Sequence, residues 1–209
     1  RDILALVNRI LESDGKQSDT FLFDPSLHPH GIKELVATPV SRMAYAVINL
    51  LRNLQAGRTQ ARDRLLALKT LYDEVLNSAH SALRRNPARA LMQIMKSMVR
   101  AHGNQLEQLK LAHDFRRTVQ GTPRVVRRML ARYHLPEMPE SWNQLAFDDH
   151  VYDANTKGRK TPTHLIMDAW IKGIRQLDVV YYNFIEPVAM EELLHAADIV
   201  GIKVRVGVE

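Results

Sequence analysis

The sequence predicts a mainly α protein in which an amino-terminal helical bundle is followed by a truncated β/α unit of strand, helix and strand. Through most of the first 140 residues, apolar side chains recur at intervals of three and four, which is helical spacing. After Trp142 the pattern changes, and the run at 177–182 is rich in β-branched and aromatic residues but too short for a helix. We therefore expect a helical domain with a basic face over residues 1–140 and a truncated β/α segment over residues 141–209.

Capping residues, prolines and glycines delimit the helices of the first part. A Thr or Asn followed by proline marks a helix start. Proline is tolerated in the first turn because the backbone N–H that it lacks would have no partner within the helix there. Each predicted helix has one apolar stripe and the connections are short, so the helices are expected to pack as antiparallel neighbours. The expected helices are residues 2–12, 38–57, 59–85, a segment after Asn86-Pro87, 105–119 and 122–133, with a loop at 13–31.

The second part alternates helix and strand. A helix is expected from Thr161-Pro162 to Gly173, a strand at 177–182, a helix from Glu186-Pro187 to Gly201, and a strand at 202–208. Short connections imply a right-handed parallel pairing of the two strands. Two parallel strands do not form a stable sheet, so we expect further strands from the region before Trp142, from another copy of the chain, or from a continuation of it. The open edge favours self-association as a homodimer.

Composition restricts the classes of function. The 209-residue chain has no cysteine, which excludes disulfides and thiolate chemistry. No apolar run reaches the roughly 18 to 20 residues that a membrane span needs, and the amino end does not have the pattern of a signal peptide. A cytoplasmic location is expected, and so is an origin as part of a longer protein.

The residues from Phe147 onward resemble a known family. They include Asp148-Asp149-His150-Val151-Tyr152, Lys157-Gly158, Thr161-Pro162, Ala169, Gly173-Ile174, Val179 to Asn183, Ala196-Ala197, Gly201-Ile202 and Gly207-Val208-Glu209. Over about 147–209 this pattern resembles the opening of a PHP (polymerase and histidinol phosphatase) domain. The resemblance implies an irregular barrel of strands and helices that binds up to three metal ions and hydrolyses phosphoesters.

The resemblance also implies specific site residues. Asp148, His150 and Glu209 match positions where the family binds a divalent metal such as zinc or manganese. Tyr152 stands where the family has a second histidine, and Tyr181 and Tyr182 stand where it has an Asp-His pair. The resemblance therefore implies a PHP-like phosphoesterase or a catalytically degenerate relative, of which this segment alone is inactive. An alternative interpretation makes Asp149 a capping residue and His150 an ordinary loop histidine.

A basic stretch supports a different interpretation. Between Arg84 and Arg132 there are 12 Lys and Arg residues but only two acidic ones, Glu107 and Asp114. Such a surface could bind nucleic-acid phosphates or an acidic partner, while a solvated helix face is the alternative without a function. The candidate binding residues are Arg84, Arg85, Arg116, Arg117, Arg124, Arg127 and Arg128, and the same stretch includes Arg89, Lys96, Arg100 and Arg132.

Overall fold

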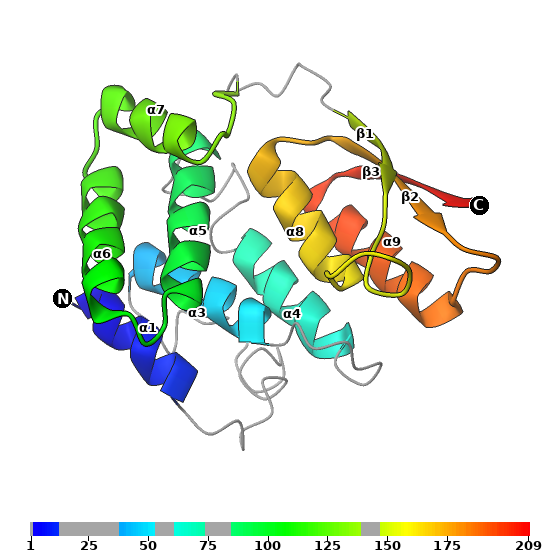
Figure 1. Cartoon of the computed structure of the whole chain (residues 1–209), viewed down its shortest axis with the longest axis horizontal. Coiled ribbons are helices and arrows are strands. Elements are labelled where there is room, and N and C mark those ends of the chain that lie inside the picture. Colours follow the sequence, from blue (N-terminus) through cyan, green and yellow to red (C-terminus); the bar gives the residue numbers. More distant parts are fainter. Residues whose placement is uncertain (1, 13–37, 53–60, 74–84, 139–146) are drawn as a thin grey trace.

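A computed structural model describes residues 2–12, 38–52, 61–73, 85–138 and 147–209. It confirms a mainly helical protein with a small parallel sheet near the carboxyl end (Figure 1). The predicted loop at 13–31 lies outside the described residues, as do residues 53–57 of the helix predicted at 38–57 and residues 74–84 of the helix predicted at 59–85. Arg85, the predicted last residue of the latter, begins α5 instead. The described helices are α1 (Asp2–Glu12), α3 (Pro39–Arg52), α4 (Ala61–Leu71), α5 (Arg85–Arg100), α6 (Gln105–Val119), α7 (Pro123–Arg132), α8 (Pro162–Lys172) and α9 (Pro187–Val200).

The predicted helix ends agree with the structure at most positions. The side chain of Asn104 caps α6 by accepting a hydrogen bond from the backbone N–H of Glu107 at 3.1 Å. Gly173 and Gly201 end α8 and α9 with φ angles of +85° and +71°, a conformation that favours glycine. Asn86 differs from the prediction, because α5 begins at Arg85 and the Asn86 side chain instead binds the backbone of Met138.

The sheet has three parallel strands in the order β1 (Phe147–Val151), β2 (Gln176–Tyr181) and β3 (Lys203–Val208). A third strand, β1, comes from residues after Trp142 and not from the region before it, while further strands from another copy or from a continuation of the chain stay a prediction. The sequence did not indicate β1 because this strand is short and mostly polar and exposed, which leaves no apolar run.

One face of the sheet is covered by helices. Leu177, Val179 and Tyr181 of β2 lie on that face and are almost completely buried, whereas the residues between them are half-buried. In Figure 1 the helices α8 and α9 lie on this side of the strands, with α4 beyond them. No described helix covers the other face, which carries an exposed ion pair between Asp178 and Arg205.

The apolar core continues from the helical bundle into the β/α unit. Buried side chains such as Val47, Leu91 and Ile94 belong to the same cluster as Ile166 and Val179. The core is therefore continuous across residue 140, where the sequence analysis divided the chain. Its residues from both parts are removed from water together, which couples their stability.

The guanidinium of Arg89 is fully buried where α5, the segment after α7, and α8 meet. Its Nε donates to the carbonyl of Ile171 at 2.7 Å, and one terminal nitrogen donates to Asn86 Oδ1 and to the carbonyl of Pro136, both at 2.9 Å. Burial lowers the pKa of Arg89 to about 10, which leaves it charged at neutral pH. Backbone carbonyls from two separate segments thus stabilise one buried cation.

A second buried polar cluster joins α5 to α8. Lys96 of α5 forms an ion pair with Asp168 of α8, and Lys160 binds the other carboxylate oxygen at 2.5 Å. Burial opposes the charge on Asp168, but Lys96, His164 and Lys160 together keep its pKa below the usual range. His164 Nε2 is buried and lies 3.7 Å from the same carboxylate, and burial lowers the pKa of His164 to about 4.

A buried ion pair between Arg64 and Glu192 fixes α4 against α9. Arg64 donates from Nε and from a terminal nitrogen to the two carboxylate oxygens at 2.8 and 2.7 Å. One of these oxygens also accepts from the backbone N–H and the hydroxyl of Thr163 in the first turn of α8, at 3.2 and 2.7 Å. Glu192 therefore occupies the positive end of α8 and holds three helices together.

Replacing Arg89 tests the first of these contacts. We expect Arg89→Met to lower the free energy of unfolding by about 2–4 kcal/mol, because the carbonyls of Ile171 and Pro136 lose their buried donor. Urea unfolding followed by circular dichroism would measure the change. The matched control is Arg128→Met on the exposed side of α7, which should change stability by less than about 0.5 kcal/mol. Equal effects of the two substitutions would contradict the role of Arg89.

His164 should make stability depend on pH. Its lowered pKa means that the unfolded chain binds a proton between about pH 6.5 and pH 4 while the folded chain does not. The contribution of His164 to the free energy of unfolding is therefore fully present above pH 6.5. It is lost as the pH falls from 6.5 toward 4, which lowers the free energy of unfolding by about 3 kcal/mol in total. The difference in unfolding free energy between the wild type and His164→Leu, measured across this range, isolates the contribution. A difference that does not vary with pH would contradict the prediction.

Candidate functional site

A polar cluster lies where the three parallel strands end. His150 is near the end of β1, and Tyr152 follows that strand directly. Tyr182 follows β2 and Glu209 follows β3, so each strand supplies side chains to the same edge of the sheet. Lys157 joins them from the turn between β1 and α8. We refer to these five residues as the strand-end cluster.

The hydroxyl of Tyr152 is at the centre of the cluster. It lies 2.6 Å from His150 Nε2, 3.0 Å from Glu209 Oε2 and 3.3 Å from the hydroxyl of Tyr182. His150 Nε2 and Glu209 Oε2 are themselves 3.7 Å apart. Two backbone hydrogen bonds hold the carboxyl end in place, from Glu209 N–H to the carbonyl of Tyr181 at 2.9 Å and from Asn183 N–H to the carbonyl of Glu209 at 3.2 Å.

These contacts determine which atoms donate. A phenol has one proton to donate and can accept two hydrogen bonds. Tyr152 donates its proton to the carboxylate of Glu209, and it accepts from the hydroxyl of Tyr182. The remaining position of the Tyr152 hydroxyl faces His150 Nε2 at 2.6 Å. The cluster is a closed hydrogen-bond network among side chains of the chain itself.

Lys157 gives the two tyrosines different acidities. Its ammonium lies 4.4 Å from the ring centre of Tyr182 and 5.8 Å from that of Tyr152. The neighbouring Lys157 ammonium lowers the pKa of Tyr182, because it favours the phenolate. Tyr182, which ionises more readily beside Lys157, and the Glu209 carboxylate both raise the pKa of Tyr152, because a further negative charge next to them is disfavoured. Tyr152 is therefore a neutral phenol at physiological pH.

Gly158 allows the turn that brings Lys157 to the cluster. The turn closes through a hydrogen bond from Gly158 N–H to the carbonyl of Asp153 at 2.8 Å. A Cβ atom at position 158 would lie 2.2 Å from the carbonyl oxygen of Tyr152, which is closer than real atoms approach. Only glycine fits against the backbone here, so the Lys157-Gly158 pair has a steric explanation.

Asp148 and Tyr181 lie outside the cluster, contrary to the expectation that the resemblance raised. Asp148 pairs in register with Leu177, whose side chain is on the helix-covered face, and the Asp148 side chain forms no hydrogen bond or ion pair with another described residue. Tyr181 also lies on the covered face, where its hydroxyl donates to the buried carboxylate of Asp153 at 2.6 Å. Alternate residues of a strand face opposite sides, which separates Tyr181 from Tyr182.

The cluster does not fit a metal centre of the kind that the resemblance implies. Such a centre needs several carboxylates and neutral imidazoles that converge on one point. Here only His150 and Glu209 are residues of that type, and the described residues contain no group of three or more His, Cys, Asp or Glu arranged to hold a metal ion. Tyr152 occupies the intervening position as a protonated phenol, which is a poor ligand.

The predicted basic surface is only partly present. Arg89 and Lys96, which the sequence analysis placed in the basic stretch, are buried and paired inside the protein, so they are not available to a partner. In the sequence, a basic residue on a solvent-exposed helix face has the same spacing as one that is buried and paired between two helices. Arg84 lies outside the described residues, and Arg85 is half-buried at the start of α5. Of the candidate binding residues, the exposed ones are Arg116, Arg117, Arg124, Arg127 and Arg128, on α6 and α7.

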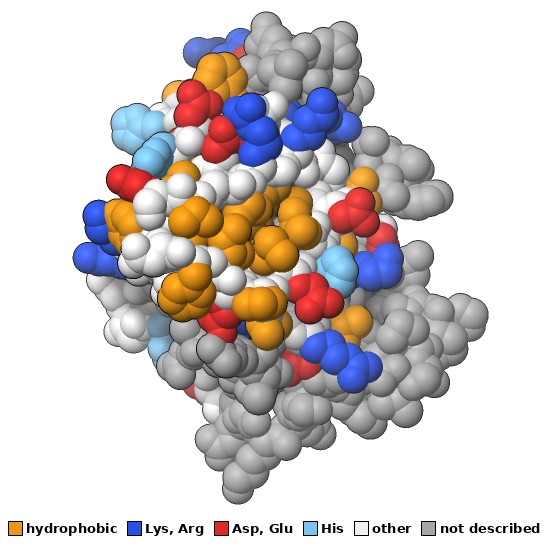
Figure 2. Space-filling model, turned by 90° about the vertical axis from the view of Figure 1, so that its right-hand side faces the viewer, with side chains coloured by type: hydrophobic (Ala, Val, Ile, Leu, Met, Phe, Trp, Pro, Cys, Tyr) orange, Lys and Arg blue, Asp and Glu red, His pale blue; other side chains and the backbone are white. Residues whose placement is uncertain are grey.

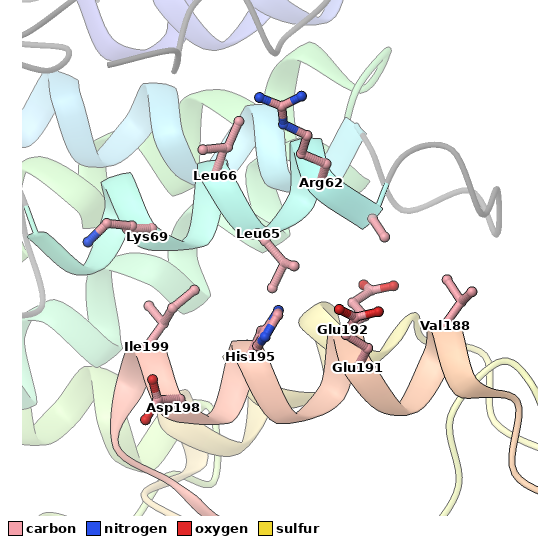
Figure 3. Close-up of a pocket in the computed structure, with 11 residues that line it drawn as sticks. Arg62, Leu65, Leu66, Lys69, Val188, Glu191, Glu192, His195, Asp198 and Ile199 are labelled. Carbon is pink, nitrogen blue, oxygen red and sulfur yellow. The ribbon is translucent and has the colours of Figure 1, made fainter. Parts of the chain in front are cut away.

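A groove between α4 and α9 was not anticipated from the sequence. It has a volume of about 440 Å³, and its walls carry opposite charges, with Arg62 and Lys69 on α4 and Glu191 and Asp198 on α9. Figure 3 shows Leu65 and His195 pointing toward each other across it. Its residues appear in the sequence only as ordinary polar faces of two helices far apart in the chain.

Exposed apolar side chains lie close to the strand-end cluster in the chain. Phe147 at the start of β1 and Val208 at the end of β3 are 63% and 54% exposed, and Phe184 after β2 is 72% exposed. Figure 2 views the side toward which β2 and β3 run in Figure 1, and it shows hydrophobic side chains gathered near the centre with charged ones around them. Of these three residues, Val208 and Phe184 lie next to strand ends, whereas Phe147 pairs with Gln176 at the opposite edge of the sheet. None of the described helices has the length and apolar character required to cross a membrane.

The sequence indicates only part of the strand-end cluster. His150 and Glu209 were predicted by the resemblance, whereas Tyr152 and Tyr182 were noted only as departures from the family pattern. Their position at strand ends was a usable signal, since parallel strands end at one edge of a sheet. Lys157 had no such signal, because a turn and not a strand brings it to the cluster.

Removing the Lys157 ammonium tests the electrostatics of the cluster. We expect Lys157→Met to raise the pKa of Tyr182, because the cation that favours its phenolate is lost. Titration of the tyrosine ring carbons by NMR in selectively labelled protein would measure this, with Tyr182→Phe assigning the signal. Lys203→Met, on the exposed start of β3, is the matched control and should leave the titration unchanged. An unaltered Tyr182 pKa in Lys157→Met would refute the arrangement.

Comparison with protein-family models, with curated proteins and with solved structures finds no match to this chain. The resemblance to the PHP family therefore rests on the residues quoted from the sequence. The strand-end cluster must be interpreted from its own geometry.

Proposed function

We propose that this chain provides the opening strands of a catalytically degenerate relative of the PHP-like phosphoesterases, and that it does not hydrolyse phosphoesters by itself. The observation that carries the proposal is the approach of His150 Nε2 to Glu209 Oε2, 3.7 Å apart at the end of parallel strands. Two residues that the resemblance assigns to metal binding thus lie together although 59 positions separate them in the sequence.

The position of the cluster supports a binding role. In folds with parallel strands and covering helices, ligands bind outside the carboxyl ends of the strands. His150, Tyr152, Tyr182 and Glu209 all lie at that end, and their side chains are exposed or half-buried and reachable from solvent.

The chemistry of the cluster supports a degenerate site. The hydroxyl of Tyr152 satisfies the two flanking groups, because it donates to Glu209 and contacts His150. A divalent cation between them would have to displace this hydroxyl and break both contacts. With only one imidazole and one carboxylate in place, the cluster lacks the ligands for metal-dependent hydrolysis.

Restoring the family residue at position 152 tests the proposal. We expect Tyr152→His to bind Zn²⁺ at least about tenfold more tightly than the wild type, because a second imidazole replaces a neutral phenol beside His150 and Glu209. Isothermal titration calorimetry with Zn²⁺ would measure the affinity of each protein. The double variant Tyr152→His with His150→Ala should lose the gain.

The matched control is Tyr133→His, which adds a histidine on the helical side of the molecule and should not raise the affinity. An affinity of Tyr152→His equal to that of Tyr133→His would contradict the proposed lineage. Hydrolysis of p-nitrophenyl phosphate by the wild-type chain with Zn²⁺ or Mn²⁺, abolished by His150→Ala, would contradict the proposal that the site is degenerate.

A further inference from the structure

A separate surface lies on α6 and α7, at the end of the molecule remote from the β-strands (Figure 1). Two leucines of α6 are unusually exposed there, Leu106 by 67% and Leu109 by 48%. The opposite side of the same helix buries Leu111 and Phe115 in the core. Helix α6 therefore presents apolar side chains on two sides, and only one of these sides is covered by the bundle.

The exposed leucines line a groove. Together with Lys110, His113 and Asp114 of α6 and Arg132 of α7, they line a shallow, open groove with a volume of about 460 Å³. A space of this size accommodates a few side chains of a partner. We refer to this groove and the exposed arginines beside it on α6 and α7 as the α6–α7 surface.

The charge of the α6–α7 surface is strongly positive. Residues 105–132 contain seven Lys or Arg against two acidic residues, which is a net charge of 7 − 2 = +5. Both acidic residues already have basic neighbours, Glu107 next to Lys110 at 3.7 Å and Asp114 paired with Arg132. Four exposed arginines have no ion-pair partner among the described residues, namely Arg116, Arg117, Arg124 and Arg128.

We propose that the α6–α7 surface docks an acidic amphipathic helix from a partner protein. Apolar side chains of that helix fill the groove over Leu106 and Leu109, and its carboxylates meet the unpaired arginines. Both features of the surface are then used, since burial of the leucines supplies affinity and the charges supply orientation and association rate. Helix-in-groove docking of this kind requires one apolar stripe and flanking charges on the partner.

The surface fits this partner better than the other anionic candidates. A nucleic-acid backbone would make no apolar contact with the exposed leucines. Base stacking requires exposed aromatic rings, and Phe115 of α6 is buried in the core. A second copy of this chain would bring an identical surface of net charge +5 and a total charge of +6, so like charges would oppose the contact.

The spacing on α6 limits the length of the partner helix. Leu106 and Arg117 are 11 residues apart, which is about 16 Å along a helix. A partner segment of about 14 residues spans this distance. Its apolar anchors belong near one end and its carboxylates toward the other.

Fluorescence anisotropy with designed peptides tests the proposal. The probe is a labelled 14-residue helical peptide with leucines near one end and glutamates toward the other. A second peptide replaces the leucines with serine, and a third replaces the glutamates with glutamine. We expect each replacement to weaken binding at least about tenfold, and raised salt to weaken binding of the first peptide.

Surface variants assign the binding to this site. Leu106→Ser with Leu109→Ser, and separately Arg116→Glu with Arg117→Glu, should each weaken binding of the first peptide at least about tenfold. Leu194→Ser on the exposed side of α9 and Lys203→Glu on β3 are the matched controls and should leave binding unchanged. These positions are exposed, and thermal melting of each variant verifies that the fold is retained.

The remaining outcomes would overturn the proposal. They are no binding of the first peptide, or equal binding of the serine peptide. Tighter binding of duplex DNA or of phosphatidylserine vesicles, insensitive to the Leu106 and Leu109 substitutions, would show that the surface recognises negative charge alone. The experiment does not depend on the strand-end cluster, so its result is independent of the proposed phosphoesterase lineage.

Discussion

The buried guanidinium of Arg89 is the contact on which the arrangement of the two parts of the chain depends. It satisfies the carbonyl of Ile171 in the last turn of α8 and that of Pro136 after α7. Gly173 packs directly against it, with the position of a missing Cβ 3.3 Å from an Arg89 nitrogen. Gly173 ends α8 shortly before β2 begins. The position of the Arg89 side chain therefore also determines where the central strand starts. A buried cation that finds its partners in two other segments penalises any other packing of them.

Two further buried polar contacts position the rest of α8. Glu192 binds the first turn of that helix and pairs with Arg64 of α4, while Asp168 in its middle pairs with Lys96 of α5. The helix is therefore fixed at its start, middle and end by side chains from other elements. Because α8 covers the sheet and leads into β2, these contacts also determine where the strand-end cluster forms.

The strand-end cluster and the α6–α7 surface differ in whether their side chains already have partners. In the strand-end cluster the charges and hydroxyls are satisfied internally, so an incoming ligand must replace hydrogen bonds that already exist. On the α6–α7 surface the leucines and several arginines have no partner among the described residues, so a ligand gains contacts without breaking any. The surfaces lie at opposite ends of the molecule (Figure 1), and occupation of one leaves the other accessible.

The sequence by itself determined the local elements. Proline after Thr122, Thr161 and Glu186 starts helices, and glycine at 173 and 201 ends them, because these residues restrict or extend the backbone whatever surrounds them. Only the tertiary structure decided which polar residues are buried and which meet. Arg89 and Lys96 look in sequence like exposed cations, β1 has no apolar pattern, and Lys157 reaches Tyr182 through a turn. Such outcomes depend on contacts between segments distant in the chain, which no local pattern encodes.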